Sequence, residues 1–319
     1  MIKKKFSIVI PVYQNELNLD DTIPECIKFI NTIEKYNVEL IFVNDGSTDS
    51  SQKLLESYYE QYRDIIKVIK LSKNFGQSAA TTAGLAYASG DVVGIISADM
   101  QDPIELFGDM LKDWEKGTRL VIATRETRKD GFLSDFFSRM FYKITNSFVV
   151  QNYPKGGFDF CIMDRVIVDQ FININQKTSG MLFTIFNFGY EYTLHHYERK
   201  ERKRGKSQYT FWKKILTFYD SLLANTYMPI RFVTALGFST SLGGFLYAIY
   251  VILTWLTNPD KEASPEGWAT IVVLISIFSG FILIALGIIG EYIWRIYVEV
   301  RNRPTYVISK IFDKLNEDR

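Results

Sequence analysis

Cysteine and histidine are both scarce in this chain, with two residues of each among 319. Cys26 and Cys161 are too few and too far apart for a disulfide scaffold or a zinc knuckle, and this usage fits a reducing cytoplasm. His195 and His196 are adjacent in an apparent strand, so their side chains face opposite sides of it. We therefore expect neither a secreted disulfide protein nor a paired histidine metal site.

An excess of charge of one sign is also missing. Lys and Arg number 37 and Asp and Glu 36, which leaves a net charge of +1. Nucleic-acid-binding domains usually carry a basic excess, so we expect no nucleic-acid partner. The sequence has no internal repeat or low-complexity tract, and its length allows one sizeable domain with an accessory region.

The N-terminal half alternates between apolar strand patterns and amphipathic helix patterns. The first apolar run, at 6–12, is too short for a signal peptide and is followed by polar residues 14–16, so we predict a strand. Further strands are predicted at 38–43, 65–71, 92–97 and 120–124, and helices at 19–35, 48–62 and 78–88. This alternation predicts an α/β domain with a mainly parallel sheet. The helix at 78–88 is rich in alanine, contains Gly84 and is expected to pack closely.

Polar turn clusters follow four of these strands, at 11–13, 44–47, 74–77 and 99–102. Ligands of open α/β sheets bind beyond the carboxyl ends of the strands, so we expect the clusters to meet at one edge. Asp99 and Gln101 are oxygen donors two residues apart in a predicted extended segment, where they face the same side. Such donors suit a divalent cation that also holds a phosphate. Taken alone, the segment also fits a solvated turn.

Two long uncharged runs, at 232–256 and 268–289, exceed the ~20 residues that cross the hydrocarbon core of a bilayer. The connection at 257–267 is polar and mostly acidic. Basic residues flank the outer ends of the runs: Lys213, Lys214, Arg231, Arg295, Arg301 and Arg303. The positive-inside rule places both termini in the cytoplasm. A pair of buried core helices is the alternative. Glu291 lies one turn before Arg295, and the two are expected to pair.

Six motifs follow one another in a characteristic order. They are IPVY at 10–13, VNDGSTD at 43–49, KNFGQ at 73–77, ADMQDP at 98–103, RKRGKSQY at 202–209 and GEYIWRIYVEVRNRP at 290–304. With these motifs the chain resembles the family 2 glycosyltransferases of the GT-A fold. It resembles more narrowly the polyisoprenyl-phosphate glycosyltransferases, which include dolichol-phosphate mannose synthases and bacterial undecaprenyl-phosphate glucosyltransferases. The resemblance covers nearly the whole chain.

The resemblance implies a GT-A domain at 1–225, a two-helix transmembrane hairpin at 226–298 and a cytoplasmic tail at 299–319. It implies an inverting transfer of a hexose-like sugar from a nucleotide sugar, with a UDP-linked donor favoured, to undecaprenyl phosphate. The enzyme is expected in the bacterial inner membrane, among membrane lipids, with its catalytic domain in the cytoplasm. A homo-oligomer and a flippase partner are also expected.

The resemblance also assigns residues to the donor. Asp45 is expected to contact the nucleotide base, and Asp99 and Gln101 are expected to hold Mg²⁺ or Mn²⁺ against the diphosphate. The remaining donor-binding candidates are Pro11, Tyr13, Glu16, Gln77 and Arg125.

Asp159, Asp99 and Arg202 are the catalytic candidates. The candidates for binding the lipid phosphate are Arg128, Arg202, Lys206 and Ser207. A phosphate acceptor is largely ionised at neutral pH, because its second pKa is about 6, so Asp159 is favoured as a positioning or electrostatic residue over an obligatory base. A loop carboxylate that caps a turn is the alternative for Asp159. The basic run at 199–206 fits both a positive-inside flank and a phosphate site.

Two positions depart from the family pattern. Ser97 stands where the family usually has an aspartate, and Gln208 where it usually has a lysine. Mg²⁺ commonly uses only one or two carboxylates, so Asp99 remains the candidate ligand. Two other functions stay open. A processive polysaccharide synthase is disfavoured because the chain lacks a Gln-x-x-Arg-Trp motif and has only two predicted spans. A non-catalytic nucleotide-sugar-binding subunit of a flippase complex is kept open by Ser97.

Overall fold

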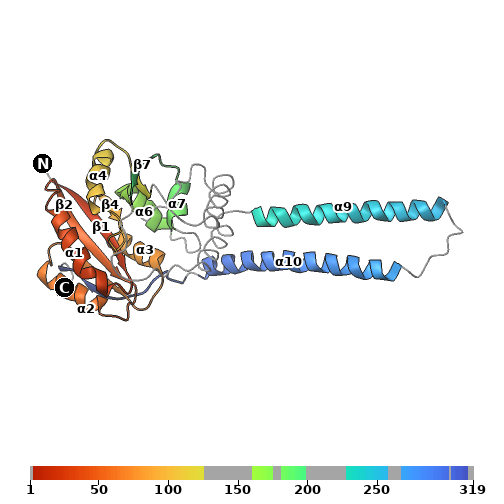
Figure 1. Cartoon of the computed structure of the whole chain (residues 1–319), viewed down its shortest axis with the longest axis horizontal. Coiled ribbons are helices and arrows are strands. Elements are labelled where there is room, and N and C mark those ends of the chain that lie inside the picture. Colours follow the sequence, from red (N-terminus) through yellow and green to blue (C-terminus); the bar gives the residue numbers. More distant parts are fainter. Residues whose placement is uncertain are drawn as a thin grey trace. The chain divides into compact units, whose positions relative to one another are not determined.

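The computed structural model describes residues 3–125, 160–174, 181–198, 228–257, 267–301 and 303–314. The chain forms two compact units, one made of 1–216 with 303–319 and the other of 217–302. The first unit carries a β-sheet with helices, and the second carries two long helices (Figure 1).

The described residues of the first unit form one sheet in the order β7-β5-β6-β4-β1-β2-β3-β8. The strands are β1 (Lys4–Val12), β2 (Tyr36–Asn44), β3 (Ile66–Leu71), β4 (Val92–Ile95), β5 (Leu120–Arg125), β6 (Phe160–Asp164), β7 (Tyr192–Tyr197) and β8 (Ile308–Phe312). The pairs β1–β2, β1–β4, β2–β3 and β5–β7 are parallel. Among the strands that the structure describes, only β6 and β8 run antiparallel to their neighbours. The predicted α/β domain with a mainly parallel sheet is confirmed.

Helices cover both faces of this sheet, as Figure 1 shows. They are α1 (Glu16–Ile30), α2 (Ser51–Gln61), α3 (Gln77–Tyr87), α4 (Phe107–Glu115), which a short 3₁₀ turn (Ile104–Leu106) precedes, α6 (Arg165–Ile174) and α7 (Met181–Asn187). Alternate residues of β1 enter two different cores. Phe6 and Ile8 pack with residues of α1, α2 and α4, whereas Val9 packs with residues of α3, α6 and α7. The period-two alternation of β1 therefore fills both faces of the sheet.

The predicted strands and helices of residues 6–124 are all present, with ends shifted by a few residues. The helix expected at 19–35 ends earlier, at Ile30, because the backbone and hydroxyl of Thr32 both donate hydrogen bonds to the Phe29 carbonyl. The close packing expected around Gly84 is confirmed. A Cβ at Gly84 would lie 2.3 Å from Val9 Cγ1, so only glycine lets α3 approach β1 this closely.

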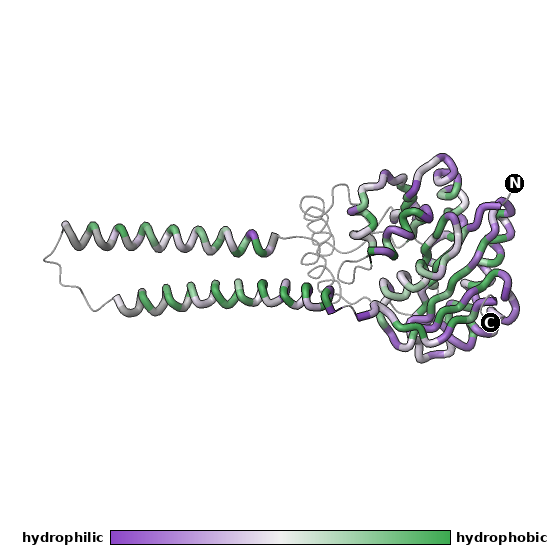
Figure 2. Tube along the Cα trace, turned by 180° about the vertical axis from the view of Figure 1, so that it is seen from behind, coloured by the Kyte–Doolittle hydropathy of each residue, from purple (hydrophilic) through white to green (hydrophobic). Residues whose placement is uncertain are grey.

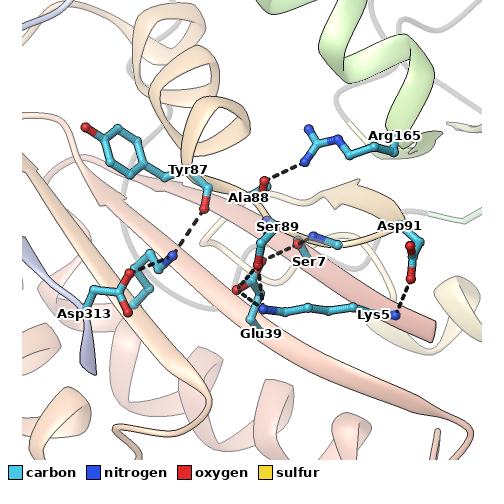
Figure 3. A network of polar contacts seen from close by, with 11 residues as sticks. Lys5, Ser7, Glu39, Tyr87, Ala88, Ser89, Asp91, Arg165 and Asp313 are labelled. Atoms are coloured by element: carbon cyan, nitrogen blue, oxygen red, sulfur yellow. Dashed lines mark hydrogen bonds and ion pairs between the residues drawn. The ribbon is translucent and has the colours of Figure 1, made fainter. Parts of the chain in front are cut away.

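The strand β8 was not predicted from the sequence, which places residues 308–312 in a tail. It pairs antiparallel with β3, at the edge of the sheet. The Phe312 ring lies 5.8 Å from that of Tyr59 in α2. Lys67 of β3 forms a 2.9 Å ion pair with Asp313 and donates a 3.2 Å hydrogen bond to the Tyr87 carbonyl (Figure 3). Apolar and ionic contacts thus anchor the segment.

The second unit contains α9 (Met228–Thr257) and α10 (Trp268–Val300). Figure 2 shows apolar residues along both helices. By length and composition, one segment among the described residues could cross a membrane, at Ile277–Val300. The first predicted span, at 232–256 in α9, is not confirmed by this criterion. Arg295 forms a 3.2 Å ion pair with Glu291, as the spacing predicted.

A polar network lies at the amino-terminal edge of the sheet (Figure 3). Glu39 of β2, 7% exposed, accepts hydrogen bonds from the Ser7 hydroxyl at 2.5 Å and from the Ser89 amide at 2.7 Å. The Lys5 ammonium lies 2.9 Å from the same carboxylate. Burial alone would raise the pKa of Glu39, but these hydrogen bonds and Lys5 lower it below its ordinary value. The network fixes the turn between α3 and β4.

We expect Glu39→Gln to lower the free energy of unfolding by about 2 kcal/mol at pH 7, because several hydrogen bonds lose a charged acceptor. A carboxylate with a lowered native pKa stabilises the fold above its unfolded pKa of about 4.3, and this contribution is lost as the pH falls through the native pKa. The difference between wild type and variant should therefore shrink below about pH 5. Chemical denaturation of both proteins over a pH series measures this difference in the free energy of unfolding.

The matched control is Glu60→Gln, whose carboxylate is 58% exposed and pairs with Arg63 on the surface of α2. Surface pairs contribute little, so this variant should unfold like the wild type at every pH. A Glu39→Gln difference that stays constant down to pH 3 would contradict the assignment.

Candidate functional site

The candidate site lies where the strand order of the sheet reverses. β1 pairs with β2 on one side and with β4 on the other. The helix α1 that follows β1 packs on one face of the sheet, and the helix α3 that precedes β4 packs on the other. A crevice at such a switch point, outside the carboxyl ends of the strands, is where open α/β sheets bind ligands. The loops after β1 and β4 flank this point, and the loop after β2 lies next to them.

Asp45 directly follows β2 and is 2% exposed. Its Oδ1 accepts a 2.7 Å hydrogen bond from the Phe75 amide, and its Oδ2 accepts a 2.9 Å hydrogen bond from the Gly76 amide. Burial raises the pKa of Asp45, although both amide hydrogen bonds oppose this effect. The carboxylate therefore joins the loop after β2 to the loop after β3, and each oxygen keeps a further lone pair with which to accept a ligand donor.

The same two loops are in direct backbone contact at Gly46. This residue has φ +65°, and a Cβ there would lie 2.3 Å from the Lys73 carbonyl carbon. The Asn44 side chain closes the turn by accepting a 2.9 Å hydrogen bond from the Ser47 amide. A residue with a side chain at position 46 would push the loops apart.

The loop after β1 is bound to the loop after β2 by reciprocal capping. The Glu16 amide donates to Asp49 Oδ2 at 3.2 Å, and Glu16 Oε2 accepts from the Ser50 amide at 2.8 Å. Each carboxylate thus caps the first turn of the other's helix. Glu16, a predicted donor-binding residue, is part of this scaffold. Pro11 lies near the end of β1 and Tyr13 begins the loop; both are half-buried.

The loop after β4 differs from its prediction. β4 ends at Ile95 rather than 97, and Met100 has φ +50°, so Asp99 and Gln101 lie in a turn. The prediction that Asp99 and Gln101 lie in an extended segment is wrong. Met100 between them has a left-handed backbone conformation, so the alternation of an extended chain does not apply to their side chains. The Ser97 hydroxyl donates a hydrogen bond to Asp99 Oδ1, and the Gln101 amide donates to the same oxygen at 3.3 Å. Asp99 is thus held within its own loop.

The oxygen donors of this loop fit a hard divalent cation. Asp99 is a half-buried carboxylate, and Ser97 supplies a hydroxyl beside it where a second carboxylate was expected. No group of three or more His, Cys, Asp or Glu side chains with the arrangement of a metal site occurs among the described residues. One carboxylate is enough for Mg²⁺ when water and substrate phosphates complete its coordination.

A buried polar chain connects this loop to β5 and β7. The Tyr197 hydroxyl donates a 2.6 Å hydrogen bond to Asp102 Oδ1, and Arg125 Nε donates to the same hydroxyl at 3.4 Å. Burial, followed by the charge and hydrogen bond of Asp102, raises the pKa of Tyr197. Arg125, a predicted donor-binding residue, is thereby placed at the carboxyl edge near the Asp99 loop.

Of the other predicted site residues, one is described by the structure and five are not. Gln77 is exposed at the first position of α3, next to the Gly76 amide that Asp45 binds. Five candidates lie outside the described residues: Arg128, Asp159, Arg202, Lys206 and Ser207. Phe160, which follows Asp159 in the sequence, begins β6 opposite the end of β4.

Sequence reasoning missed Asp102 and Tyr197. Asp102 lies within a motif that was recognised, but only the structure gives it a partner 95 residues away. The two histidines of β7 have different neighbours, as their alternation predicted. His195 Nε2 lies 2.8 Å from Asp113 Oδ2, and His196 Nδ1 lies 2.9 Å from the Thr124 hydroxyl.

Comparisons with known proteins identify the family of the chain. The family model described as "Glycosyl transferase family 2" matches residues 7–176. An uncharacterized glycosyltransferase of Bacillus subtilis is 34% identical over 97% of this chain and 94% of its own length. The SfII prophage-derived bactoprenol glucosyl transferase of Shigella flexneri is 31% identical over 96% of this chain and 98% of its own length.

Solved structures resemble the chain more distantly. Glucosyl-3-phosphoglycerate synthase from Mycobacterium tuberculosis, in complex with Mn²⁺, UDP-glucose and phosphoglyceric acid, is 16% identical, with a TM-score of 0.46. The match covers 69% of this chain and 78% of that one. A mannosyltransferase from Pyrobaculum calidifontis, in complex with GDP-Man and Mn²⁺, is 14% identical, with a TM-score of 0.45, over 90% and 88% of the two chains. The family match covers more than half of the sequence, so this chain belongs to glycosyl transferase family 2 and is a glycosyltransferase.

Proposed function

We propose that this glycosyltransferase transfers a hexose-like sugar from a UDP-sugar to undecaprenyl phosphate, with inversion at the anomeric carbon and with the help of Mg²⁺ or Mn²⁺. The reaction takes place at the cytoplasmic face of a bacterial inner membrane. In this proposal α9 and α10 form a two-helix membrane hairpin.

The observation that carries the proposal is the placement of the Asp45 and Asp99 loops at the carboxyl edge of the sheet, where β1 alone separates their strands, β2 and β4. A nucleotide sugar needs a polar contact for its base and a cationic site for its diphosphate, a few ångströms apart. Buried Asp45 suits a base N–H donor, and half-buried Asp99 suits a metal-bound diphosphate. Pro11, Tyr13, Glu16 and Gln77 would border the base, while Gln101 would share the metal and Arg125 would bind the diphosphate.

Two further observations support a lipid acceptor. Relatives named bactoprenol glucosyl transferases match at 30–31% identity over 96% of this chain. The long helices also leave many large apolar side chains exposed, among them Phe238 at 70% in α9 and Leu283 at 68% in α10. Apolar surface of this extent marks a membrane or protein contact.

In the proposed reaction, an oxygen of the lipid phosphate attacks the anomeric carbon as the bond from that carbon to the UDP oxygen breaks, and the electron pair leaves with UDP. A bound divalent cation would neutralise the charge that gathers on the leaving diphosphate. Arg125 adds positive charge on the same side of the sheet. One displacement inverts the anomeric centre.

The acceptor carries its own nucleophile, since a phosphate monoester is ionised at neutral pH. Asp159 therefore serves to position the sugar or to stabilise positive charge on it, and no obligatory base is required. Arg128, Arg202, Lys206 and Ser207 would bind the lipid phosphate.

We expect the purified full-length chain, given undecaprenyl phosphate and radiolabelled UDP-sugars with Mg²⁺ or Mn²⁺, to form a labelled lipid. EDTA should reduce the rate by at least about 100-fold, because the leaving group would lose its counter-charge. Restoring Mg²⁺ or Mn²⁺ should restore the rate.

Three outcomes would contradict the proposal. A long water-soluble polymer would indicate a processive synthase. Binding of UDP-sugars without any labelled lipid, under every donor tried, would favour a non-catalytic subunit. Transfer that EDTA leaves unchanged would remove the metal from the reaction.

A further inference from the structure

We propose that Tyr197 is a positioning residue of this enzyme, which fixes the Asp99 loop against the ends of β5 and β6. The inference rests on the function proposed above and deepens it. Tyr197 acts through its neighbours and does not itself touch the reacting atoms.

The hydroxyl of Tyr197 joins two charged groups of the candidate site. It donates to Asp102 Oδ1 at 2.6 Å and accepts from Arg125 Nε at 3.4 Å. Asp102 is 1% exposed and Tyr197 8%, so water does not compete strongly for these hydrogen bonds. Asp102 lies three residues after Asp99 in the same loop, so the hydrogen bond from Tyr197 restrains the loop that carries the Asp99 carboxylate.

The ring of Tyr197 contacts a different strand. It packs edge-to-face on Phe160, with 5.8 Å between ring centroids, and Phe160 packs in the same way on Phe107 at 4.8 Å. Phe160 is the residue after Asp159 in the sequence. One side chain thus connects the loop after β4, the end of β5 and the start of β6.

The covalent position of Tyr197 adds a third connection. Tyr197 ends β7, pairs in register with Arg125, and precedes the basic run at 199–206 by two residues. In the proposed function this run receives the lipid phosphate. Tyr197 therefore contacts a residue assigned to the donor and stands, in the sequence, two residues before the segment assigned to the acceptor.

Tyr197→Phe tests the proposal, because it removes the hydroxyl and keeps the ring on Phe160. In the full-length chain, we expect the Mn²⁺ concentration for half-maximal transfer to rise about tenfold and kcat to fall about tenfold, since small misplacements of catalytic groups cost up to about 100-fold. The thermal midpoint should fall as well, because the buried Asp102 carboxylate loses a hydrogen-bond donor. A purely structural tyrosine would shift the midpoint and leave the Mn²⁺ requirement unchanged.

The matched control is Tyr36→Phe. Tyr36 is 9% exposed, and its hydroxyl donates to the Glu115 carboxylate at 2.5 Å, so the tyrosine itself matches Tyr197 in burial and hydrogen-bond type, although Glu115 is more exposed than Asp102. Tyr36 begins β2, at the edge of the sheet opposite the candidate site. This variant should keep the wild-type Mn²⁺ requirement and kcat.

Asp102→Asn and the double variant Tyr197→Phe/Asp102→Asn test whether Tyr197 acts through Asp102. If Tyr197 acts through Asp102, the double variant should be no worse than the poorer single one. If the fold-losses of the two single variants multiply in the double variant, the proposal is overturned. A wild-type Mn²⁺ requirement in Tyr197→Phe, or a raised one in Tyr36→Phe, would also overturn it.

Binding of UDP and of GDP, each with Mn²⁺, separates this inference from the proposed transfer. If the wild type binds a nucleotide with Mn²⁺ but makes no labelled lipid, the transfer proposal fails. A tenfold weaker Mn²⁺-dependent binding by Tyr197→Phe would still support the positioning role, and equal binding would overturn it. A wild type that binds neither nucleotide would overturn both proposals.

Discussion

Asp99→Ala is expected to reduce sugar transfer by at least about 1000-fold, to the limit of detection. Asp99 is the carboxylate of the loop after β4, and its Oδ1 is held by the Ser97 hydroxyl and the Gln101 amide. Without this carboxylate, the cation that neutralises the departing diphosphate would lose its ionised protein ligand. Initial rates with a radiolabelled UDP-sugar and undecaprenyl phosphate measure the effect.

Ser97→Ala is the matched comparison, two residues away in the same loop. It removes one hydrogen bond to Asp99 and keeps the carboxylate, so we expect a loss of about tenfold or less, in line with about 1.5 kcal/mol for a hydrogen bond to a charged group. The Mn²⁺ concentration for half-maximal rate should rise modestly. Equal losses of activity in Asp99→Ala and Ser97→Ala would contradict the assignment of Asp99 as the metal ligand.

Gly46→Ala is expected to reduce transfer by about 100-fold or more, chiefly through weaker donor binding. The new Cβ would lie 2.3 Å from the Lys73 backbone, which cannot move without drawing the Phe75 and Gly76 amides away from Asp45. A left-handed conformation at a residue with a side chain adds about 1–2 kcal/mol to the cost. The KM for the nucleotide sugar and the thermal midpoint measure the two effects.

Gly76→Ala separates the effect of the close contact between the two loops from the effect of a positive φ angle. Gly76 also has a positive φ, +96°, but a Cβ there would meet nothing within 4 Å. This variant should lose stability from backbone strain and retain a near wild-type KM for the donor. If both alanine variants raise KM equally, backbone strain rather than the contact between the loops controls donor binding.

The sheet of residues 4–125 could be predicted because its information is local. Each strand there is an apolar run of the right length, and the patterns of α1, α2 and α3 predicted those helices, whereas α4 was not predicted. The polar clusters after these strands were also predictable, since parallel strands place their carboxyl ends at one edge. The family motifs then identified Asp45 and Asp99 as candidates.

The details that depend on distant or unusual contacts were not predictable. The left-handed Met100 gives no signal in the sequence, because glycine, asparagine or aspartate usually marks such a conformation. The hydrogen bond between Tyr197 and Asp102 joins residues 95 positions apart. The role of Asp45 in binding two amides of the loop after β3 is likewise visible only in three dimensions.

The pairing of β8 with β3 has a consequence for how the protein is made. Synthesis proceeds from the N-terminus, so β3 leaves the ribosome long before residues 308–312, and both long helices are translated in between. Until then the outer backbone of β3 lacks its native partner, and such an edge can pair with other chains. Biogenesis of the two units is therefore coupled: the helical unit must be translated before the sheet of the other can be completed. A chain interrupted after α10 would carry an open sheet edge, however intact its Asp45 and Asp99 loops.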